Sequence, residues 1–217
     1  MVAGWVQPGT TIGLGSGRAV RAVIDALGRR FDGRAPIRAI VASRTSDAAA
    51  REVGIEIVSL TADTRPVLLI DGADEIDPDL QLIKGGGGAL LHEKVLCDAT
   101  GGLVVIAEAF KHTERLGLRF RLPIEVLHFG WEVTAARIEE VLATPSLRAD
   151  ASGEPYVTEE GNLLLDTPLG PVGDLHALAA RLSAIPGVVE HGLFLGWTRA
   201  VVLGRADGTT EVLGDAP

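Results

Sequence analysis

The sequence predicts an α/β protein that has a doubly wound, mostly parallel sheet and a second, smaller α+β domain. Two observations predict the sheet. Strand-like and helix-like segments alternate through the first half of the chain, and residues 67–71 and 103–108 are near-continuous aliphatic runs, typical of strands that helices cover on both faces. A third observation, a change of pattern from about residue 118, predicts the smaller domain.

The first strand and helix are predicted from "TTIGLGSG" and the segment that follows it. Residues 10–17 indicate a strand that enters a glycine turn, and residues 19–30 indicate a helix with apolar side chains at helical spacing. These apolar residues are Val20, Val23, Ile24 and Leu27. The alternation then continues with an expected strand at 37–43, a helix at 46–54, and strands at 55–60, 67–71 and 103–108.

Residues 118–188 are predicted to form a small α+β domain of ferredoxin-like type. The segments "RLPIEVL", "WEVTAARIEEVLAT", "PYVTEEGNLLLDT" and "DLHALAARLSAI" follow one another in β-α-β-α order. After them, "RAVVLGRADGTTEVL" indicates two strands joined at an Asp-Gly turn, which return to the first domain. Residues 1–117 together with 189–217 are therefore predicted to form the main, Rossmann-like domain.

Composition and charge exclude several classes of function. The chain has 217 residues, of which 47% are hydrophobic, so it can bury a substantial core. Its formal net charge of -9 argues against a surface for nucleic acid or anionic lipid, although a local site for a small anion remains possible. The start "MVAGWVQPGT" lacks the features of a secretory signal, and no apolar run reaches transmembrane length. The single cysteine, Cys97, excludes an internal disulfide. We therefore expect a cytoplasmic protein.

The loop "GLGSGR", residues 13–18, could bind an anion through its backbone N–H groups. A dinucleotide fingerprint would require a third glycine where Arg18 stands, and an acid at the end of the second strand is also missing. A phosphate loop of the G-x-x-x-x-G-K-[ST] type is absent from the sequence. Two interpretations remain open: a compact anion cradle that includes the Ser16 hydroxyl and the Arg18 guanidinium, or a tight turn without a ligand.

The segment after the strand at 67–71 is rich in acidic residues. Asp71, Asp74 and Glu75 stand where side chains project into the ligand crevice of an open parallel sheet. Asp71 directly follows the buried strand, which favours a functional role. For Glu75, Asp77 and Asp79 we expect solvated side chains instead.

A lysine, four glycines and a glutamate follow this acidic segment. Lys84 precedes the glycines at 85–88, and residues 89–99 indicate a helix whose apolar stripe is expected at Leu91, Val95 and Ala99. Glycines before a helix let the backbone approach a ligand closely, with free N–H groups that face an oxyanion. Together with Glu93 as a proton carrier, these groups suit proton abstraction next to a carbonyl and stabilisation of an enediolate.

The stretch "DGADEIDPDLQLIKGGGGALLHEKV" resembles the signature of the type A ribose-5-phosphate isomerase family. Similarity extends from "VQPGTTIGLGSG" through "IAEAFK" and "LPIEV" to "IPGVVEHGLF", nearly the whole chain. The resemblance implies an aldose-ketose isomerase that interconverts D-ribose 5-phosphate and D-ribulose 5-phosphate through an enediolate, in the non-oxidative pentose phosphate pathway. It implies no metal and no other cofactor. We also expect a homo-oligomer, a dimer or a tetramer, with a sugar phosphate as its partner.

The resemblance also implies roles for individual residues. Glu93 matches the proton-transferring base, and Lys84 matches the cation beside the enediolate oxygens. Asp71 and Asp74 match the pair that assists ring opening and holds the sugar hydroxyls. The substrate-binding positions are Ser16, Gly17, Arg18, Ala19, Gly72, Ala73, Gly85, Gly86, Gly87 and Lys111.

The sequence departs from the family pattern in two places. The substrate loop, commonly Thr-Gly-Ser-Thr, reads Ser-Gly-Arg-Ala here, so hydroxyls are missing at Arg18 and Ala19, and the guanidinium could replace them on phosphate. Family members usually carry a further helix ahead of "VQPGT", where only "MVAGW" stands here. Either the sequence starts late, or another element covers that face of the sheet.

Two other functions fit the residues less well. A sugar-phosphate sensor would need a DNA-reading module, for which length and charge leave no room, and an acyl-CoA transferase would need a nucleophilic glutamate. Other candidate side chains have structural explanations: His92 as a surface residue, Cys97 as a small buried hydrophobic residue, and Thr45 or Ser46 as a helix N-cap. The remaining histidines have no metal-ligand spacing.

Overall fold

The computed structural model describes residues 1–216 and divides into two compact units. The first unit consists of residues 1–72, 92–109 and the segment from 197 onward, and the second of residues 73–91 and 110–196. The second unit therefore includes three segments outside the small domain expected at 118–188, namely 73–91, 110–117 and 189–196.

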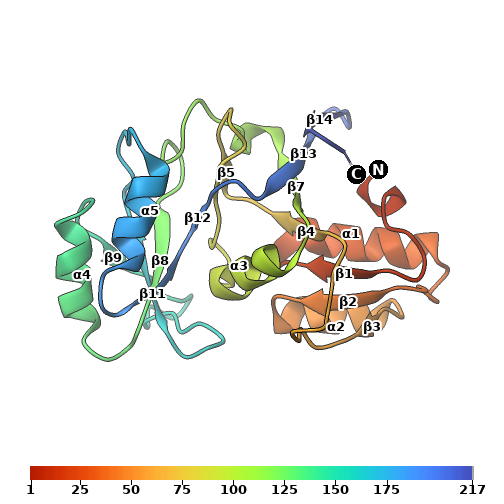
Figure 1. The fold of residues 1–217 in the computed structure, drawn as a ribbon, viewed down its shortest axis with the longest axis horizontal. Helices are drawn as coiled ribbons and strands as arrows, with labels where there is room; N and C mark the ends of the chain where they lie inside the picture. The colour runs from red at the N-terminus through yellow and green to blue at the C-terminus, as the bar shows by residue number, and fades with distance from the viewer. Residues whose placement is uncertain (217) are drawn as a thin grey trace. The chain divides into compact units, whose positions relative to one another are not determined.

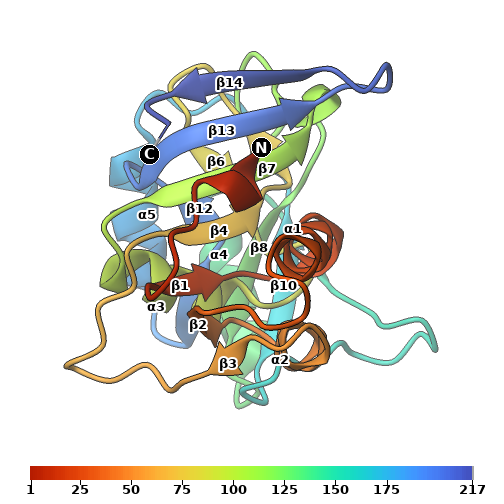
Figure 2. The same ribbon diagram turned by 90° about the vertical axis from the view of Figure 1, so that its right-hand side faces the viewer.

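The first unit is built on a seven-stranded sheet in the order β14-β13-β7-β4-β1-β2-β3 (Figure 2). All neighbouring strands pair in parallel except β13 and β14, which form the expected antiparallel pair at one edge. This mostly parallel sheet confirms the predicted fold class. The strands are β1 (Thr11–Leu14), β2 (Arg38–Val41), β3 (Glu56–Ile57), β4 (Leu69–Gly72), β7 (Leu103–Glu108), β13 (Thr198–Gly204) and β14 (Thr210–Gly214).

Helices α1 (Gly17–Arg30) and α2 (Arg44–Glu52) lie on the same side of this sheet (Figure 2). The buried face of α1 is the predicted one, Val20, Val23, Ile24 and Leu27, with Gly28 beside them. The prediction for the start of α2 was wrong: its N-cap is Ser43, whose Oγ accepts a hydrogen bond from the Ser46 N–H at 3.2 Å. A short 3-10 helix, η1 (Val2–Gly4), precedes β1, and Val2 packs in the same core.

The order of the strands reverses between β1 and β4. From β1 the chain proceeds outward to β2 and β3, whereas β4 lies on the other side of β1 and is followed by β7. Open α/β sheets bind ligands outside the carboxyl ends of the strands at such a switch point. The residues at these two strand ends are Gly15 and Asp71, and the Gly15 N–H donates to the Ile70 carbonyl at 2.9 Å.

The second unit is an α+β arrangement with two antiparallel sheets (Figure 1). Its four-stranded sheet has the order β11-β8-β10-β9 and packs with two helices around a core that includes Ile124, Ile138 and Leu178. The three-stranded sheet has the order β12-β6-β5. The elements are β5 (Glu75–Ile76), β6 (Leu82–Ile83), β8 (Leu122–Val126), α4 (Trp131–Glu139), β9 (Ser146–Leu147), β10 (Leu163–Thr167), α5 (Leu175–Ser183), β11 (Val188–His191) and β12 (Leu193–Phe194).

Two further elements include residues of both units. Helix α3 (Leu90–Ala99) begins one residue after the predicted start and ends at the predicted residue, and its residues from 92 onward count with the first unit. The other is the 3-10 helix η2 (Ala109–Lys111). Among the described residues, none of the helices is long and apolar enough to cross a membrane.

The prediction of an apolar stripe at Leu91, Val95 and Ala99 on α3 was wrong. Val95 is 49% exposed, while the buried residues of the helix are Leu90, Glu93, Lys94, Leu96 and Cys97. This buried face contains two charged side chains, which a hydrophobic pattern assigns to the solvent side. The expected burial of Cys97 is confirmed, with 1% of the residue exposed.

Candidate active site

The predicted site residues fall into two sets, one in each unit. We name the set in the first unit the strand-end set, which consists of Ser16, Gly17, Arg18, Ala19, Asp71, Gly72 and Glu93. We name the set in the second unit the glycine-loop set, which consists of Ala73, Asp74, Lys84, Gly85, Gly86, Gly87 and Lys111.

Ser16 connects two carboxylates of the strand-end set. Its N–H donates to Asp71 Oδ1 at 3.1 Å, and its hydroxyl donates to Glu93 Oε1 at 2.5 Å. Asp71 Oδ1 also accepts the Gly72 N–H at 2.7 Å. Both carboxylates are buried, Asp71 fully and Glu93 with 3% exposed, and buried carboxylates depend on such hydrogen bonds. The loop after β1 therefore organises acidic groups from β4 and α3.

Gly15 is required by the close approach of the chain to Asp71. A Cβ atom at position 15 would lie 1.8 Å from the carboxyl carbon of Asp71, a distance that no two non-bonded atoms can adopt. The Ser46 hydroxyl donates to the Gly15 carbonyl at 2.7 Å and holds the same residue from the other side. A glycine at the end of β1 thus allows the Asp71 carboxylate to lie against the backbone.

Arg18 lies in the first turn of α1 with its side chain 95% exposed. Its guanidinium is 3.9 Å from the Glu108 carboxylate, a long contact between two exposed groups that contributes little. The anion cradle considered from the sequence combined this guanidinium with the Ser16 hydroxyl. In the structure the guanidinium faces solvent, and the hydroxyl bonds to Glu93.

The β5–β6 pair organises the glycine-loop set. Glu75 pairs with Ile83, and the Asp74 N–H donates to the Ile83 carbonyl at 2.9 Å, which places Asp74 beside the residues that follow β6. Asp74 Oδ2 then accepts the Gly86 N–H at 2.6 Å. A Cβ atom at position 86 would lie 2.6 Å from Asp74 Oδ1, so a glycine is needed for this contact.

Lys84 is a buried cation, with 2% of the residue exposed. Its N–H donates to the Gly192 carbonyl at 2.9 Å, and its Nζ lies 5.3 Å from the centroid of the Phe194 ring. An ammonium at this distance from an aromatic face is attracted to the ring. The strand β12 therefore helps to hold the lysine at the end of β6.

Lys111 donates from its Nζ to the Ala73 carbonyl at 2.6 Å. The side chain is half-buried, and an ammonium has three donors, so this bond leaves further hydrogen-bonding capacity. The contact fixes the lysine next to the segment that carries Asp74.

The expectation that Glu75 and Asp77 are solvated was wrong. Glu75 is fully buried and accepts the N–H groups of Gly117 at 2.6 Å, Leu118 at 3.1 Å and Arg119 at 2.9 Å. These donors lie more than 40 residues downstream, so the sequence around Glu75 does not predict its hydrogen bonds. Asp79 is exposed, as expected.

Asp77 is 7% exposed, and burial raises the pKa of its carboxyl. Hydrogen bonds from the N–H groups of Gln81, at 2.8 Å, and Asp79, at 3.0 Å, oppose this shift in pKa without cancelling it.

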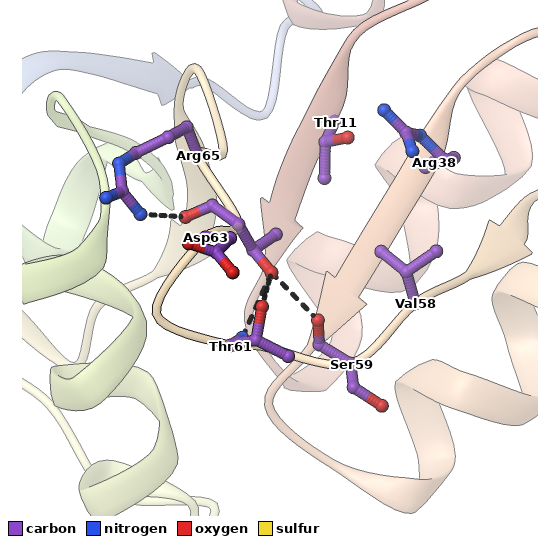
Figure 3. Close-up of a pocket in the computed structure, with 8 residues that line it drawn as sticks. Thr11, Arg38, Val58, Ser59, Thr61, Asp63 and Arg65 are labelled. Carbon is purple, nitrogen blue, oxygen red and sulfur yellow. Dashed lines mark hydrogen bonds between the residues drawn. The ribbon is translucent and has the colours of Figure 1, made fainter.

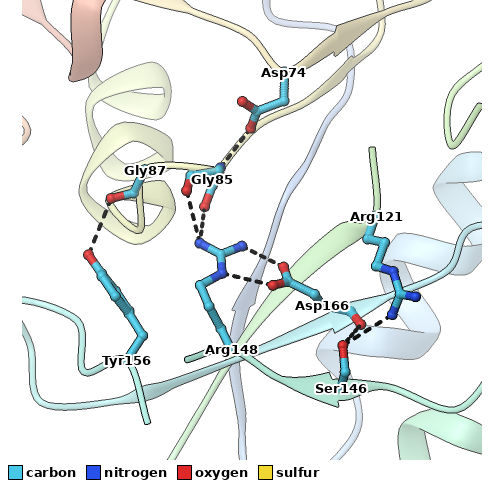
Figure 4. Close-up of polar contacts among 9 residues, drawn as sticks. Asp74, Gly85, Gly87, Arg121, Ser146, Arg148, Tyr156 and Asp166 are labelled. Atoms are coloured by element: carbon cyan, nitrogen blue, oxygen red, sulfur yellow. Dashed lines mark hydrogen bonds and ion pairs between the residues drawn. The ribbon is translucent and has the colours of Figure 1, made fainter. Parts of the chain in front are cut away.

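Two side chains that contact the glycine loop, Arg148 and Tyr156, were not predicted from the sequence (Figure 4). The expectation for His92 needs correction as well: the side chain is half-buried, and its Nδ1 lies 3.0 Å from the Ala42 carbonyl oxygen. Within residues 1–216, no group of three or more His, Cys, Asp and Glu side chains could hold a metal ion.

A cavity of about 390 Å³ lies at the amino ends of β1 and β2, opposite to the carboxyl ends that carry the strand-end set (Figure 3). It is lined by Thr11 and Arg38, the first residues of β1 and β2, together with residues of the segment 58–65. None of the predicted site residues lines it. The cavity is therefore distinct from the carboxyl ends of β1 and β4.

Comparison with known proteins decides the family. The sequence model of ribose 5-phosphate isomerase A (phosphoriboisomerase A) matches residues 38–208, most of the chain. The chain belongs to the ribose 5-phosphate isomerase A family. The resemblance inferred from the motifs is thereby confirmed.

Curated members of the ribose 5-phosphate isomerase A family match along nearly the full length of the chain. The ribose-5-phosphate isomerase A of Roseiflexus sp. (strain RS-1) is 46% identical over 95% of this chain and 90% of its own length. That of Chloroflexus aurantiacus is 42% identical over 95% of this chain and 87% of its own length.

Solved structures of the family have the same fold. The ribose 5-phosphate isomerase from Plasmodium falciparum superimposes with a TM-score of 0.91 at 33% identity, covering 100% of this chain and 95% of that one. A D-ribose-5-phosphate isomerase in complex with phospho-erythronic acid gives a TM-score of 0.93 at 28% identity, covering 99% of this chain and 94% of that one.

Proposed function

We propose that this chain interconverts D-ribose 5-phosphate and D-ribulose 5-phosphate through an enediolate. The observation that carries the proposal is the family match over residues 38–208, which includes the whole of the acidic, lysine and glycine segment. The related isomerase in complex with phospho-erythronic acid supports it. That ligand carries a phosphate and a carboxylate, and the carboxylate resembles the two oxygens of an enediolate.

Glu93 is the proposed base. Its carboxylate takes the proton from C2 of the open-chain aldose, the electron pair forms the C1–C2 double bond, and the aldehyde oxygen becomes an oxyanion. The same carboxylate returns the proton to C1, while the hydroxyl proton on O2 passes to O1, which yields the ketose. The hydrogen bond from Ser16 to Oε1 supports this role because it orients the carboxylate without removing its charge.

Lys84 and the N–H groups of Gly85, Gly86 and Gly87 are proposed to stabilise the oxyanion. Donors and cations fixed in advance stabilise charge that develops in a transition state more effectively than mobile water does. The burial of Lys84 and its contact with the Phe194 ring support a fixed ammonium. The glycine residues, including Gly72 with its neighbour Ala73, offer their backbone to the substrate.

Asp71 and Asp74 are proposed to assist ring opening and to hold the sugar hydroxyls. Both carboxylates are held by backbone N–H groups, those of Ser16 and Gly72 for Asp71 and that of Gly86 for Asp74. A carboxylate fixed in this way can accept hydrogen bonds from sugar hydroxyls in a defined direction.

The loop Ser16–Ala19, with Gly17 and Arg18, is proposed to bind substrate at its phosphate end, and Lys111 is proposed to bind substrate as well. The exposed guanidinium of Arg18 at the start of α1 suits a phosphate, because it can donate two hydrogen bonds and the helix N-terminus also favours an anion. We further propose a cytoplasmic homodimer that acts in the non-oxidative pentose phosphate pathway without a metal or other cofactor.

The proposal is tested by incubating the purified protein with D-ribose 5-phosphate and measuring ketose formation, with and without EDTA. We expect turnover in both conditions, conversion in the reverse direction from D-ribulose 5-phosphate, and far slower turnover of unphosphorylated ribose. A folded protein that converts neither sugar phosphate would contradict the function. Activity that EDTA abolishes and a divalent ion restores would contradict the metal-free mechanism. Light scattering of the same sample tests the dimer.

A further inference from the structure

The Arg148 guanidinium joins one carboxylate to the glycine loop (Figure 4). Its Nε and Nη2 donate to the two oxygens of Asp166 at 2.9 and 2.5 Å, a bidentate pair whose side chains are 14% and 24% exposed. Its Nη1 donates to the Gly85 carbonyl at 2.9 Å and to the Gly86 carbonyl at 3.1 Å. One guanidinium thus binds Asp166 through Nε and Nη2 and the loop through Nη1.

Tyr156 binds the next carbonyl of the same loop. Its hydroxyl donates to the Gly87 carbonyl at 3.3 Å, and its ring lies 6.0 Å from the Arg148 guanidinium carbon (Figure 4). A Cβ atom at position 88 would lie 2.3 Å from this hydroxyl, so the loop and the tyrosine are in close contact. Three successive carbonyls, those of residues 85 to 87, therefore accept hydrogen bonds from side chains outside the loop.

Holding a carbonyl also fixes the N–H group of the following residue. The two groups belong to one planar peptide unit, so the bond to the Gly85 carbonyl sets the direction of the Gly86 N–H, which donates to Asp74. The bond to the Gly86 carbonyl sets the direction of the Gly87 N–H in the same way. Glycine has the largest backbone freedom of all residues. The conformation of this four-glycine loop must therefore be fixed by contacts with residues outside the loop.

We propose that Arg148, oriented by Asp166, is a positioning residue for the isomerisation. It holds the peptide units of Gly85 and Gly86 so that their N–H groups and the Asp74 carboxylate keep the geometry that the reaction needs. The inference rests on the proposed function, and it adds a residue that no motif includes. Arg148 acts through the loop and through Asp74, and it is not itself assigned to the substrate.

A positioning role and a purely structural role predict different kinetics. If Arg148 only stabilised the fold, a folded variant would keep its kcat. If it orders donors that act on developing charge, the loss appears mainly in kcat, because those donors contribute most in the transition state. Phosphate binding is assigned to other residues, so KM for ribose 5-phosphate should change less.

Kinetics of Arg148→Lys provide the first test. Lysine keeps the charge but cannot bind Asp166 in a bidentate manner and reach two carbonyls at once. We expect kcat to fall by roughly 10- to 10²-fold, the cost of a misplacement of about 1 Å, with KM changed by less than the fall in kcat. Tyr156→Phe, which loses one hydroxyl, should show a smaller fall in kcat. Arg121→Lys is the matched control. Arg121 donates to Ser146 Oγ at 3.1 Å and, within residues 1–216, to none of the carbonyls of residues 85 to 87, so the kcat of this variant should stay at the wild-type value.

Hydrogen exchange provides a second test that needs no enzymatic activity. Gly86 N–H donates to Asp74 and Gly88 N–H donates to the Gly85 carbonyl at 3.0 Å, so both amides should be protected in the wild-type protein. We expect exchange of these amides to accelerate by roughly 10-fold in Arg148→Lys and to be unchanged in Arg121→Lys. If Arg148→Lys does not fold, the same measurement on Asp166→Asn decides, with acceleration expected at Gly86 and Gly88, because this change removes the charge that orients the Arg148 guanidinium.

The outcomes separate this inference from the proposed function. A wild-type protein without isomerase activity would contradict the function, while exchange at Gly86 and Gly88 would still test the contact. A folded Arg148→Lys variant with wild-type kcat, an equal loss of kcat in Arg121→Lys, or exchange at Gly86 and Gly88 that does not change would overturn the inference.

Discussion

The Ser16 hydroxyl donates a 2.5 Å hydrogen bond to the Glu93 carboxylate, while the N–H of the same residue donates to Asp71. One residue at the end of β1 thus holds two buried carboxylates that come from β4 and α3. A hydrogen bond to a charged acceptor is short and strong, so it restricts the position of the carboxylate more than a neutral bond would.

Removing the Ser16 hydroxyl should impair catalysis through Glu93. In Ser16→Ala the carboxylate loses an oriented, charge-assisted bond, so we expect kcat/KM for ribose 5-phosphate to fall by roughly 10- to 10²-fold. Ser16→Thr is the control, because it keeps a hydroxyl at this position and should retain most of the activity. Steady-state kinetics of the two variants measure the difference, and equal losses in both would show that the hydroxyl is not the group that matters.

Arg18 is expected to bind the phosphate. Arg18→Ala should raise KM for ribose 5-phosphate by roughly 10- to 10²-fold, as for the loss of a charge-assisted hydrogen bond, and should leave the turnover of unphosphorylated ribose nearly unchanged. Arg21→Ala serves as the control, since this arginine of the same helix pairs with Asp25 and Glu52. An unchanged KM in Arg18→Ala would assign the guanidinium to the solvated start of the helix.

Gly15→Ala should displace Asp71. The new Cβ atom would lie 1.8 Å from the Asp71 carboxyl carbon, so the carboxylate and its bond from the Ser16 N–H must move. We expect kcat to fall by roughly 10²-fold, because small displacements of reacting groups are costly. Gly4→Ala, where a Cβ atom meets nothing within 4 Å, is the control and should behave as wild type. A Gly15→Ala variant with normal kcat would mean that the position of Asp71 does not limit the reaction.

Asp77 should make stability depend on pH. Burial raises the pKa of its carboxyl above the ordinary value of 3.8, so the folded protein binds this proton more readily than the unfolded chain does. The free energy of unfolding therefore decreases as the pH rises from about 3.8 through the raised pKa. Asp77→Asn keeps an oxygen that can accept from Asp79 and Gln81 but carries no charge. Urea unfolding should give the variant a larger free energy of unfolding than wild type at pH 7, and this difference should shrink toward pH 4. A difference that does not depend on pH would contradict the assignment.

The regular elements of the first unit were predictable because their patterns are local. The run at Leu103–Glu108 and the spacing of apolar residues in Gly17–Arg30 identify a covered strand and an amphipathic helix without knowledge of the rest of the chain. The strand expected at 55–60 is only Glu56–Ile57, since its length depends on how far β2 offers a partner. Local sequence does not contain that information.

The candidate site was predictable where a motif names residues, and not where distant groups meet. The bond between Ser16 and Glu93 joins residues 77 positions apart, and the burial of Glu75 depends on N–H groups that lie more than 40 positions further along the chain. Arg148 reaches the loop from a separation of 63 residues and lies in no recognisable motif. Periodicity reports which face of an element is apolar, so it misassigns faces that carry buried charges, as in α3.

The most direct test of the proposed mechanism is the turnover of Glu93→Gln on ribose 5-phosphate. Glutamine keeps the size of the side chain and can still accept from the Ser16 hydroxyl, but it cannot take the proton from C2. We predict that turnover falls by roughly 10² to 10⁴, the usual contribution of general acid-base catalysis, with little change in substrate affinity. Washout of deuterium from C2-labelled substrate should fall in parallel. A variant that keeps more than about a tenth of wild-type turnover, outside that range, would contradict the assignment of Glu93 and move the base to Asp71 or Asp74.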